Sequence, residues 1–258
     1  MAMYDNENTV RASFDLNNIS EYLLQAQWAE FIELKKVIME VADRNQRPVT
    51  ILDIGIGNAR IPKHLCGIKD IWDKVAFYDG TDNAIACVKI SNQEIEKLNI
   101  RDKVAAHYFE AVNLDTWNKK YDMVITTWFT AGNFYPDDFP FDTYRDSGNR
   151  FDLNTNGKFT AIFKNAYELL NPGGEIVIGA CYHDNNPTRL KQEESYLKMG
   201  MTIITTLNDS FTATKEGFWS QRFTPEKLYR YLNFADPSKI NITPLDTYNY
   251  AMQVRIKK

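Results

Sequence analysis

The sequence lacks an excess of basic residues and any long apolar run. Its 258 residues include 30 Lys and Arg against 34 Asp and Glu, giving a net charge of −4, and no basic block interrupts this balance. We therefore expect no nucleic-acid partner, because proteins that bind nucleic acids gather Lys and Arg on one surface. No window is apolar over the length needed to span a bilayer, so we expect no membrane partner either.

Cysteine is also scarce. Cys66, Cys87 and Cys181 are odd in number and lie far apart, without the spacing of metal ligands or of a disulfide framework. The first residues have neither the basic start nor the apolar run of a signal peptide. These features predict reduced thiols in a cytoplasmic enzyme or binding protein, and they leave the oligomeric state open.

What the chain does have is an alternation of strand and helix patterns. Apolar residues recur at helical spacing over residues 18–45, and VTILDIG (49–55) has the short, β-branched pattern of a buried strand. Further strand and helix patterns alternate up to residue 183. This order predicts an α/β fold, with a doubly wound, mostly parallel seven-stranded sheet and helices on both faces.

The last third of the chain has a different pattern. Residues 201–222 indicate two extended segments joined by a turn, and Thr224 begins a helix with proline at its first position. Residues 240–248 and 250–258 then indicate a closing pair of strands.

No linker separates these parts, so we expect one domain over residues 1–258. Within it, residues 1–47 form an N-terminal helical segment and residues 48–184 the core. An insertion at 133–157 and the hairpin at 201–222 are expected to cap the substrate.

Two glycines follow the first strand in the stretch ILDIGIGNAR, residues 51–60. Ligands of open α/β sheets bind beyond the carboxyl ends of the strands, which is where this turn lies. A dinucleotide-binding turn needs a small residue where this chain has Arg60, and Asp53 would repel a pyrophosphate. The carboxylate suits a cationic ligand without phosphates, and a tight turn with no ligand is the alternative.

The residues LDIGIGNA resemble the first motif of class I S-adenosylmethionine-dependent methyltransferases, D/E-x-G-x-G-x-G/A. YDGTDNAI resembles the second motif of that family. EAVNLDTW, YDMVITTW and LLNPGGEIVIGA follow in the family's order and spacing, so that the resemblance covers residues 51–180. It implies a Rossmann-like methyltransferase of the small-molecule type with S-adenosyl-L-methionine as cofactor.

The resemblance also implies which residues hold the cofactor. The glycine turn approaches the methionine and ribose parts, Asp53 orients the ammonium end, and Asp82 accepts hydrogen bonds from the ribose hydroxyls. Asp82 would also suit the N-cap of the next helix. The adenine contact stays open, since Val112 and Asn113 stand where the family usually has an acid. The implied set is Asp53, Gly55, Gly57, Asn58, Asp82, Asn83, Asn113 and Thr127.

The acceptor is expected beside the end of the fourth strand and under the cap. That strand ends in TTWFTAGN, without the motifs of adenine, glutamine, arginine or catechol methyltransferases, and no cluster has metal-ligand spacing. The candidate substrate-binding residues are Trp128, Phe129, Asn133, Tyr135, Trp219 and Arg222. His183, which follows the fifth strand, is the candidate general base, and an exposed loop histidine is the alternative.

Residues 133–157 mix aromatics with Asp137, Asp138, Asp142 and Asp146, a combination that can receive a cationic amine. A solvated loop held by its aromatic residues is the alternative. We expect metal-independent, in-line transfer of a methyl group to a small molecule, with an amine nitrogen slightly preferred over a hydroxyl.

Two other functions remain open. A methyltransferase acting on protein or RNA is disfavoured by the acidic charge and compact length. A non-catalytic S-adenosylmethionine-binding module is disfavoured by the intact glycine motif.

Overall fold

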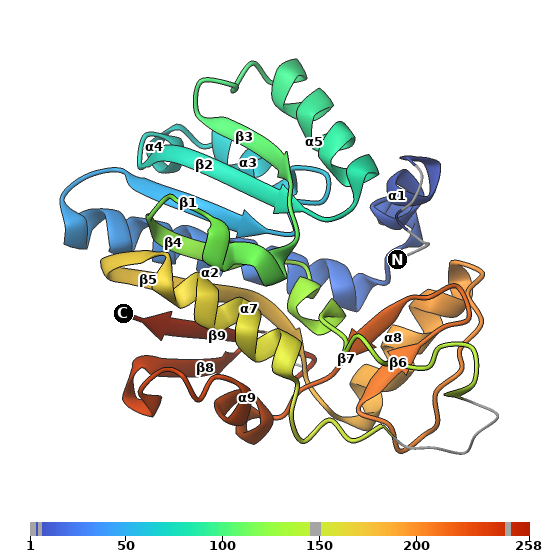
Figure 1. Cartoon of the computed structure of the whole chain (residues 1–258). Helices are drawn as coiled ribbons and strands as arrows, with labels where there is room; N and C mark the ends of the chain where they lie inside the picture. The colour runs from blue at the N-terminus through green and yellow to red at the C-terminus, as the bar shows by residue number, and fades with distance from the viewer. Residues whose placement is uncertain (1–3, 5–6, 145–150, 246–248) are drawn as a thin grey trace.

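The computed structural model describes residues 4, 7–144, 151–245 and 249–258. Its centre is a seven-stranded sheet in the order β3-β2-β1-β4-β5-β9-β8 (Figure 1). The strands are β1 (Val49–Ile54), β2 (Val75–Asp82), β3 (Val104–Tyr108), β4 (Tyr121–Thr126), β5 (Leu170–Tyr182), β8 (Ile240–Pro244) and β9 (Ala251–Lys257). Strands β1 to β5 are parallel, and β9 runs antiparallel to both β5 and β8. The predicted α/β fold with a mostly parallel sheet is confirmed.

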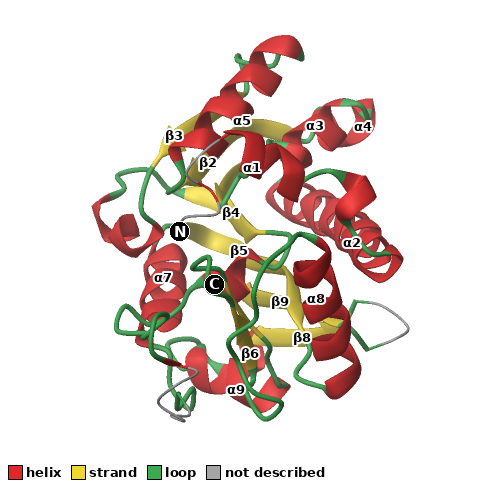
Figure 2. Ribbon diagram, turned by 90° about the vertical axis from the view of Figure 1, so that its right-hand side faces the viewer, coloured by secondary structure: helices red, strands yellow, loops and turns green. Residues whose placement is uncertain are grey.

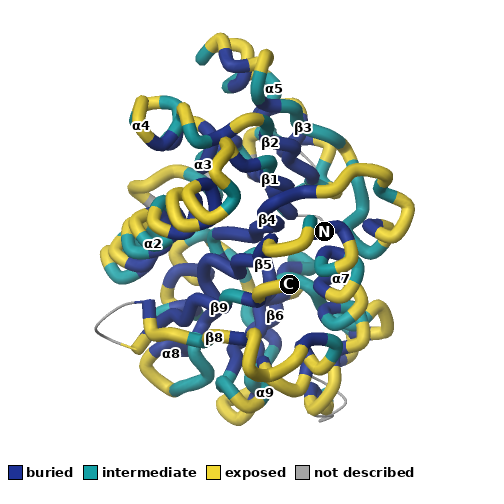
Figure 3. Tube along the Cα trace, turned by 90° about the vertical axis from the view of Figure 1, so that its left-hand side faces the viewer, coloured by how far each residue is buried: buried dark blue, intermediate teal, exposed yellow. Residues whose placement is uncertain are grey.

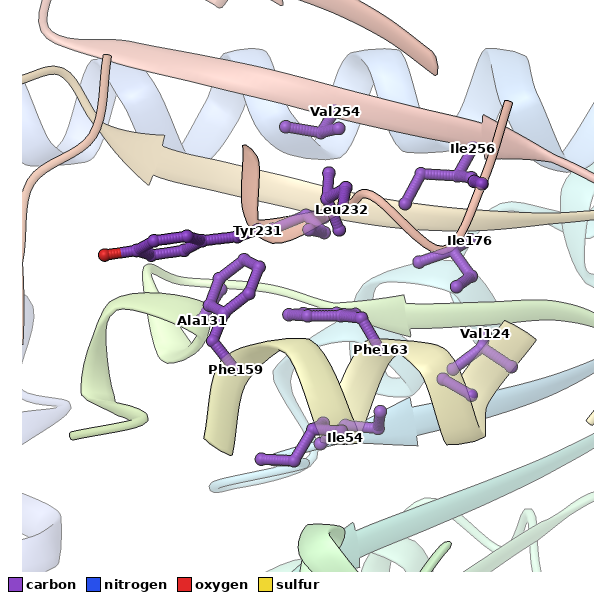
Figure 4. Close-up of a cluster of buried hydrophobic side chains, with 14 of the residues drawn as sticks. Ile54, Val124, Ala131, Phe159, Phe163, Ile176, Tyr231, Leu232, Val254 and Ile256 are labelled. Atoms are coloured by element: carbon purple, nitrogen blue, oxygen red, sulfur yellow. The ribbon is translucent and has the colours of Figure 1, made fainter. Parts of the chain in front are cut away.

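Helices cover both faces of the sheet. One face carries α2 (Glu21–Asn45), α3 (Arg60–Cys66), α4 (Lys69–Trp72) and α5 (Ile85–Lys97). The other carries α7 (Gly157–Glu168) and α9 (Pro225–Tyr231), whose aromatic side chains pack on the strands (Figure 4). Short 3-10 helices are η2 (Leu16–Asn18), η3 (Ala111–Thr116), η4 (Thr130–Asn133) and η5 (Pro237–Lys239).

The first strand illustrates why these segments pair in this way. Ile51 packs toward α2, whereas Leu52 and Ile54 pack toward α7. Because both faces of a parallel sheet are covered, its strands need apolar residues on both sides. This explains why the pattern of the strand is continuously apolar. Figure 3 shows the central strands buried, with helices around them that are partly exposed.

A second layer lies beyond the carboxyl ends of the strands. It contains α8 (Asn186–Lys198) and a two-stranded sheet of β6 (Phe211–Ala213) and β7 (Trp219–Gln221) (Figure 1). Figure 2 looks onto this edge, with α1 (Glu7–Ser13) in its upper half and α8 in its lower half. Among the described helices, none has both the length and the apolar character to cross a membrane.

Three parts of this layer differ from the sequence-based expectation. The paired strands of the hairpin are shorter than the predicted range 201–222. Neither α8 nor α1 was predicted from the sequence pattern. The buried residues of α8 are mostly polar, and they include Thr188, Arg189, Gln192 and Ser195.

Candidate functional site

A cavity opens at the carboxyl ends of β1, β2 and β4, where open α/β sheets bind their ligands. It encloses about 1150 Å³, including solvent at its mouth. Its wall combines the glycine turn, the end of β2, the segment after β3 and the segment after β4. Tyr4 and Phe14, from the N-terminal segment, complete the lining.

The glycine turn presents its backbone to this cavity. Gly55 and Gly57 adopt φ values of 85° and 61°, a region that favours glycine. A Cβ at Gly57 would lie 2.8 Å from the ring of Phe14, so glycine also permits this close approach. The Gly57 N–H donates to Asp82 at 3.0 Å, which ties the turn to the end of β2.

Asp82 lies in the wall of the cavity, as its motif implied. Burial raises its pKa to about 6, although N–H groups of Ala84 and Gly57 favour the charged form. It accepts the N–H of Ala84, the residue directly before α5, at 2.9 Å, so that it also organises the turn into that helix. A carboxylate offers about four lone-pair sites, and two of them remain for a ligand.

Asp53 lies beneath the turn rather than in the cavity wall. It is 1% exposed and is absent from the lining, and the Tyr78 hydroxyl donates to its Oδ2 at 2.6 Å. Burial raises the pKa of Asp53 to about 7. Its Oδ1 is buried without a hydrogen-bond partner in the described ranges. Contact with a ligand in this cavity would therefore need an intermediary.

Of the two positions in the segment after β3 that the sequence offered for the adenine contact, Val112 and Asn113, only Val112 lines the cavity. Glu110 lines the cavity with Phe109 and Val112. Asn113, which was a candidate for the adenine contact, does not line it. It lies exposed in η3, where its carbonyl accepts the Thr116 hydroxyl at 2.8 Å. The acidic residue that this segment brings to the cavity is therefore Glu110, three positions before Asn113.

The end of β4 divides its aromatic residues between two directions. Thr127, Trp128, Asn133 and Tyr135 line the cavity. Phe129 does not, because its ring stacks on Tyr182 with centroids 3.7 Å apart. Both residues have a left-handed backbone, with φ of 56° at Trp128 and 61° at Phe129.

Two residues of the hairpin lie away from the cavity. Trp219 is fully buried and stacks on Phe211 with centroids 4.0 Å apart. Arg222 is 1% exposed and donates to Gln192 of α8 at 2.6 Å and to Thr212 of β6 at 2.7 Å. Both side chains hold the second layer together, so we leave them out of the candidate site.

His183 is also absent from the lining. Its Nδ1 lies 3.3 Å from the Asn249 carbonyl and 3.2 Å from the Asn185 amide, in the loop that precedes α8. This placement gives no contact with the cavity for a general base. In the ranges that the structure describes, no group of three or more His, Cys, Asp and Glu residues is arranged to hold a metal ion.

Sequence reasoning missed several lining residues. Arg60 served only to exclude a dinucleotide, yet it lines the cavity, as does Lys158 at the start of α7. Glu110 begins the segment already singled out after the third strand. Tyr4 and Phe14 carry no local signal, because their position depends on how the N-terminal segment packs against α5.

Solved structures that are distant in sequence have similar folds. A 1,6-didemethyltoxoflavin-N1-methyltransferase from Burkholderia thailandensis, with 1,6-didemethyltoxoflavin and S-adenosylhomocysteine bound, matches at a TM-score of 0.54 and 11% identity, covering 97% of this chain and 84% of that chain. An S-adenosylmethionine-dependent methyltransferase from Clostridium acetobutylicum matches at 0.54 and 13%, covering 97% and 95%.

The magnesium protoporphyrin IX methyltransferase of Synechocystis, with S-adenosylhomocysteine bound, matches at a TM-score of 0.54 and 12% identity, covering 93% of this chain and 88% of that chain. No protein-family model and no curated protein matches the sequence. The likeness establishes that this chain has the Rossmann-like fold of class I methyltransferases.

Proposed function

We propose that this chain is an S-adenosylmethionine-dependent methyltransferase acting on a small organic molecule. One observation carries the proposal: in a class I fold, the glycine turn, Asp82 and Glu110 line a single cavity at the carboxyl ends of adjacent strands. The neighbours from Burkholderia and Synechocystis contain S-adenosylhomocysteine, which supports the same cofactor here.

The lining residues fit the parts of this cofactor. Asp82 has lone pairs left for the ribose hydroxyls, and Glu110 suits the adenine amino group. The Oδ1 of Asn58 is buried and unpartnered within the described ranges, and it suits the ammonium at the methionine end. A buried polar atom without a partner is costly, so a ligand that pairs with it binds more tightly.

S-adenosylmethionine supplies a methyl group bonded to a positively charged sulfur, which a nucleophile can displace directly. The chain would contribute alignment and exclusion of water more than acid–base chemistry. Trp128 and Tyr135 bring aromatic rings to the cavity, and aromatic faces attract cations. Asp82 and Glu110 add negative charge to the same wall.

Of the loop acids that favoured an amine acceptor, the three that the structure describes do not line the cavity. Asp137 pairs with Lys158 at 2.6 Å and its side chain is 83% exposed. Asp138 and Asp142 are also exposed, and Asp146 lies outside the described residues. Because these charges lie at the surface, the proposal includes both amine and hydroxyl acceptors.

A small acceptor is favoured over a macromolecule by the roof of the cavity. Tyr4 and Phe14 lie in its lining, and the Phe14 ring packs directly on the glycine turn. Side chains from the chain's own N-terminal segment thus form part of the cavity wall, which leaves less room for a macromolecule.

The test is methyl transfer from labelled S-adenosylmethionine into the amine and hydroxyl compounds of a metabolite extract. We expect labelled small molecules, with kcat/KM reduced about tenfold to a hundredfold in Asp82→Asn, as for a lost hydrogen bond to a charged group. Asp115→Asn, at an exposed position in η3, is the matched control and should keep full activity. Label found only in protein or RNA, or full activity in Asp82→Asn, would contradict the proposal.

A further inference from the structure

A fully buried carboxylate lies behind the cavity wall. Glu30 of α2 has 0% exposure and does not line the cavity. Its Oε2 accepts a hydrogen bond from Arg60 Nη2 at 2.6 Å, and its Oε1 accepts the Trp128 N–H at 2.8 Å. A Cβ at Gly179 of β5 would lie 2.5 Å from Oε1, so β5 needs glycine to pass this close. One carboxylate thus connects α2, the start of α3, the end of β4 and β5.

The backbone at the end of β4 needs such a restraint. Trp128 and Phe129 are consecutive aromatic residues with φ values of 56° and 61°. A left-handed conformation is unfavourable for an L residue, because its Cβ comes too close to the following carbonyl oxygen. Strained conformations of this kind persist where the surroundings impose them, and they cluster at functional sites. The hydrogen bond to Glu30 fixes the first peptide group of this pair.

Arg60 is held from two sides and retains N–H groups for a ligand. Glu30 binds its Nη2, and its guanidinium carbon lies 5.5 Å from the centroid of the Trp128 ring. The side chain is 12% exposed and lines the cavity. Its Nη1 is buried with no hydrogen-bond partner in the part of the chain described. A guanidinium pairs bidentately with a carboxylate or a phosphate, and S-adenosylmethionine carries a carboxylate and no phosphate.

We propose that Arg60 binds the carboxylate at the amino-acid end of the cofactor and that Glu30 is the positioning residue that holds Arg60 in place. This inference rests on the proposed function. The other cationic side chain in the lining, Lys158, is already paired with Asp137. Arg60 follows the glycine turn directly, next to the position assigned to the methionine end.

Two ligands separate the carboxylate from the rest of the cofactor. S-adenosylhomocysteine carries the amino-acid end, whereas 5′-methylthioadenosine has the same adenosine and thioether without it. By calorimetry, Arg60→Gln should weaken S-adenosylhomocysteine about tenfold to a hundredfold, as for a lost charge-assisted hydrogen bond. Its affinity for 5′-methylthioadenosine should equal that of the wild type.

Glu30→Gln tests the positioning role. The glutamine still offers an acceptor for the Trp128 N–H but removes the charge opposite Arg60. We expect the same selective loss of S-adenosylhomocysteine affinity, smaller than in Arg60→Gln. A merely structural role would weaken both ligands alike, because both occupy the adenosine site.

Two further variants control for a loss of folding in Arg60→Gln and Glu30→Gln. The single variants leave one buried charge unpaired, whereas the double variant Glu30→Gln/Arg60→Gln removes both charges and should fold stably. Glu175→Gln is the matched control, since this carboxylate also has 0% exposure and pairs with Arg44 and Arg255. It does not line the cavity, and it lies beside Met123, near the amino end of β4. The substitution should lower stability without changing the ratio of the two affinities.

The double variant should show the selective loss of S-adenosylhomocysteine affinity in full. Equal affinity for S-adenosylhomocysteine in wild type and double variant would overturn the inference, and so would an equal loss for both ligands. An unchanged affinity together with a raised KM for an acidic acceptor would overturn it too, by assigning the carboxylate to the acceptor. Failure of the wild type to bind either ligand would instead contradict the proposed function.

Discussion

Three carboxylates at the two ends of the parallel strands differ in their partners. Asp122, at the amino ends (the amino edge), pairs with a cation directly, whereas the buried Asp53 and the half-buried Asp82, at the carboxyl ends (the carboxyl edge), do not. At the amino edge, Asp122 accepts two N–H groups of Arg47 at 2.7 and 2.8 Å and the Thr50 N–H at 2.9 Å. Burial alone would raise the pKa of Asp122, but Arg47, Thr50 and Asn171 together lower it below its usual value.

At the carboxyl edge, Asp53 and Asp82 form no ion pair within the described ranges. Burial raises the pKa of Asp53 to about 7 and that of Asp82 to about 6. Unpaired buried charge is destabilising, and it persists mainly where a ligand or a reaction uses it. We infer from this contrast that Asp122 stabilises the fold, whereas Asp53 and Asp82 leave negative charge for a cationic ligand.

The largest effect is expected from removing the buried carboxylate of Asp122 at the amino edge. Asp122→Ala removes a buried carboxylate and leaves the Thr50 N–H, the Asn171 amide and Arg47 without their acceptor, so the free energy of unfolding should fall by about 3–5 kcal/mol. Urea denaturation measures this change. Calorimetry on the folded variant should give unchanged affinity for S-adenosylhomocysteine, and lost affinity in folded protein would contradict the division between the edges.

The next effect is a pH dependence at the carboxyl edge. Asp53 has its pKa raised from 3.8 to about 7, so the native state keeps its proton at pH values where the unfolded chain loses it. Stability should therefore fall as pH rises from about 4 to about 7, by on the order of 2–4 kcal/mol.

Asp53→Asn removes this titration while the amide oxygen still accepts from Tyr78. Urea denaturation across this pH range should give a smaller slope for the variant than for the wild type. Identical slopes for the two proteins would show that the Asp53 carboxylate is not the group responsible.

The smallest effect concerns a residue placed outside the cavity. His183→Ala should leave kcat/KM and its pH profile unchanged, because His183 contacts Asn249 and Asn185 rather than the lining. Rates measured between about pH 6 and 9, on either side of the usual histidine pKa, decide the point. A pH–rate profile that loses its acid limb in the variant would restore His183 as a general base.

The core of the fold could be predicted from the sequence because its signals are local. The apolar period over α2, the run in β1 and the glycines after it each follow from one segment's own packing. The position of the cavity follows as well, since parallel strands end at one edge.

The hairpin of the second layer was predicted from its extended pattern, but α8 could not be predicted in this way, because it reverses the usual pattern. Leu190 and Leu197 of this helix are exposed, whereas Gln192 is fully buried and binds Arg222. Such burial is favourable only once the hairpin supplies the partner. Likewise, Arg60 shows its role only beside Glu30, which lies 30 positions earlier in the chain.

The central claim is that the carboxyl edge binds an S-adenosyl cofactor through Asp82. Calorimetric titration of S-adenosylhomocysteine into the wild type and Asp82→Asn tests it most directly. We predict binding to the wild type and an affinity lower by about 1.5–3 kcal/mol in the variant. No binding to the wild type, or equal affinity in the two proteins, would contradict the claim.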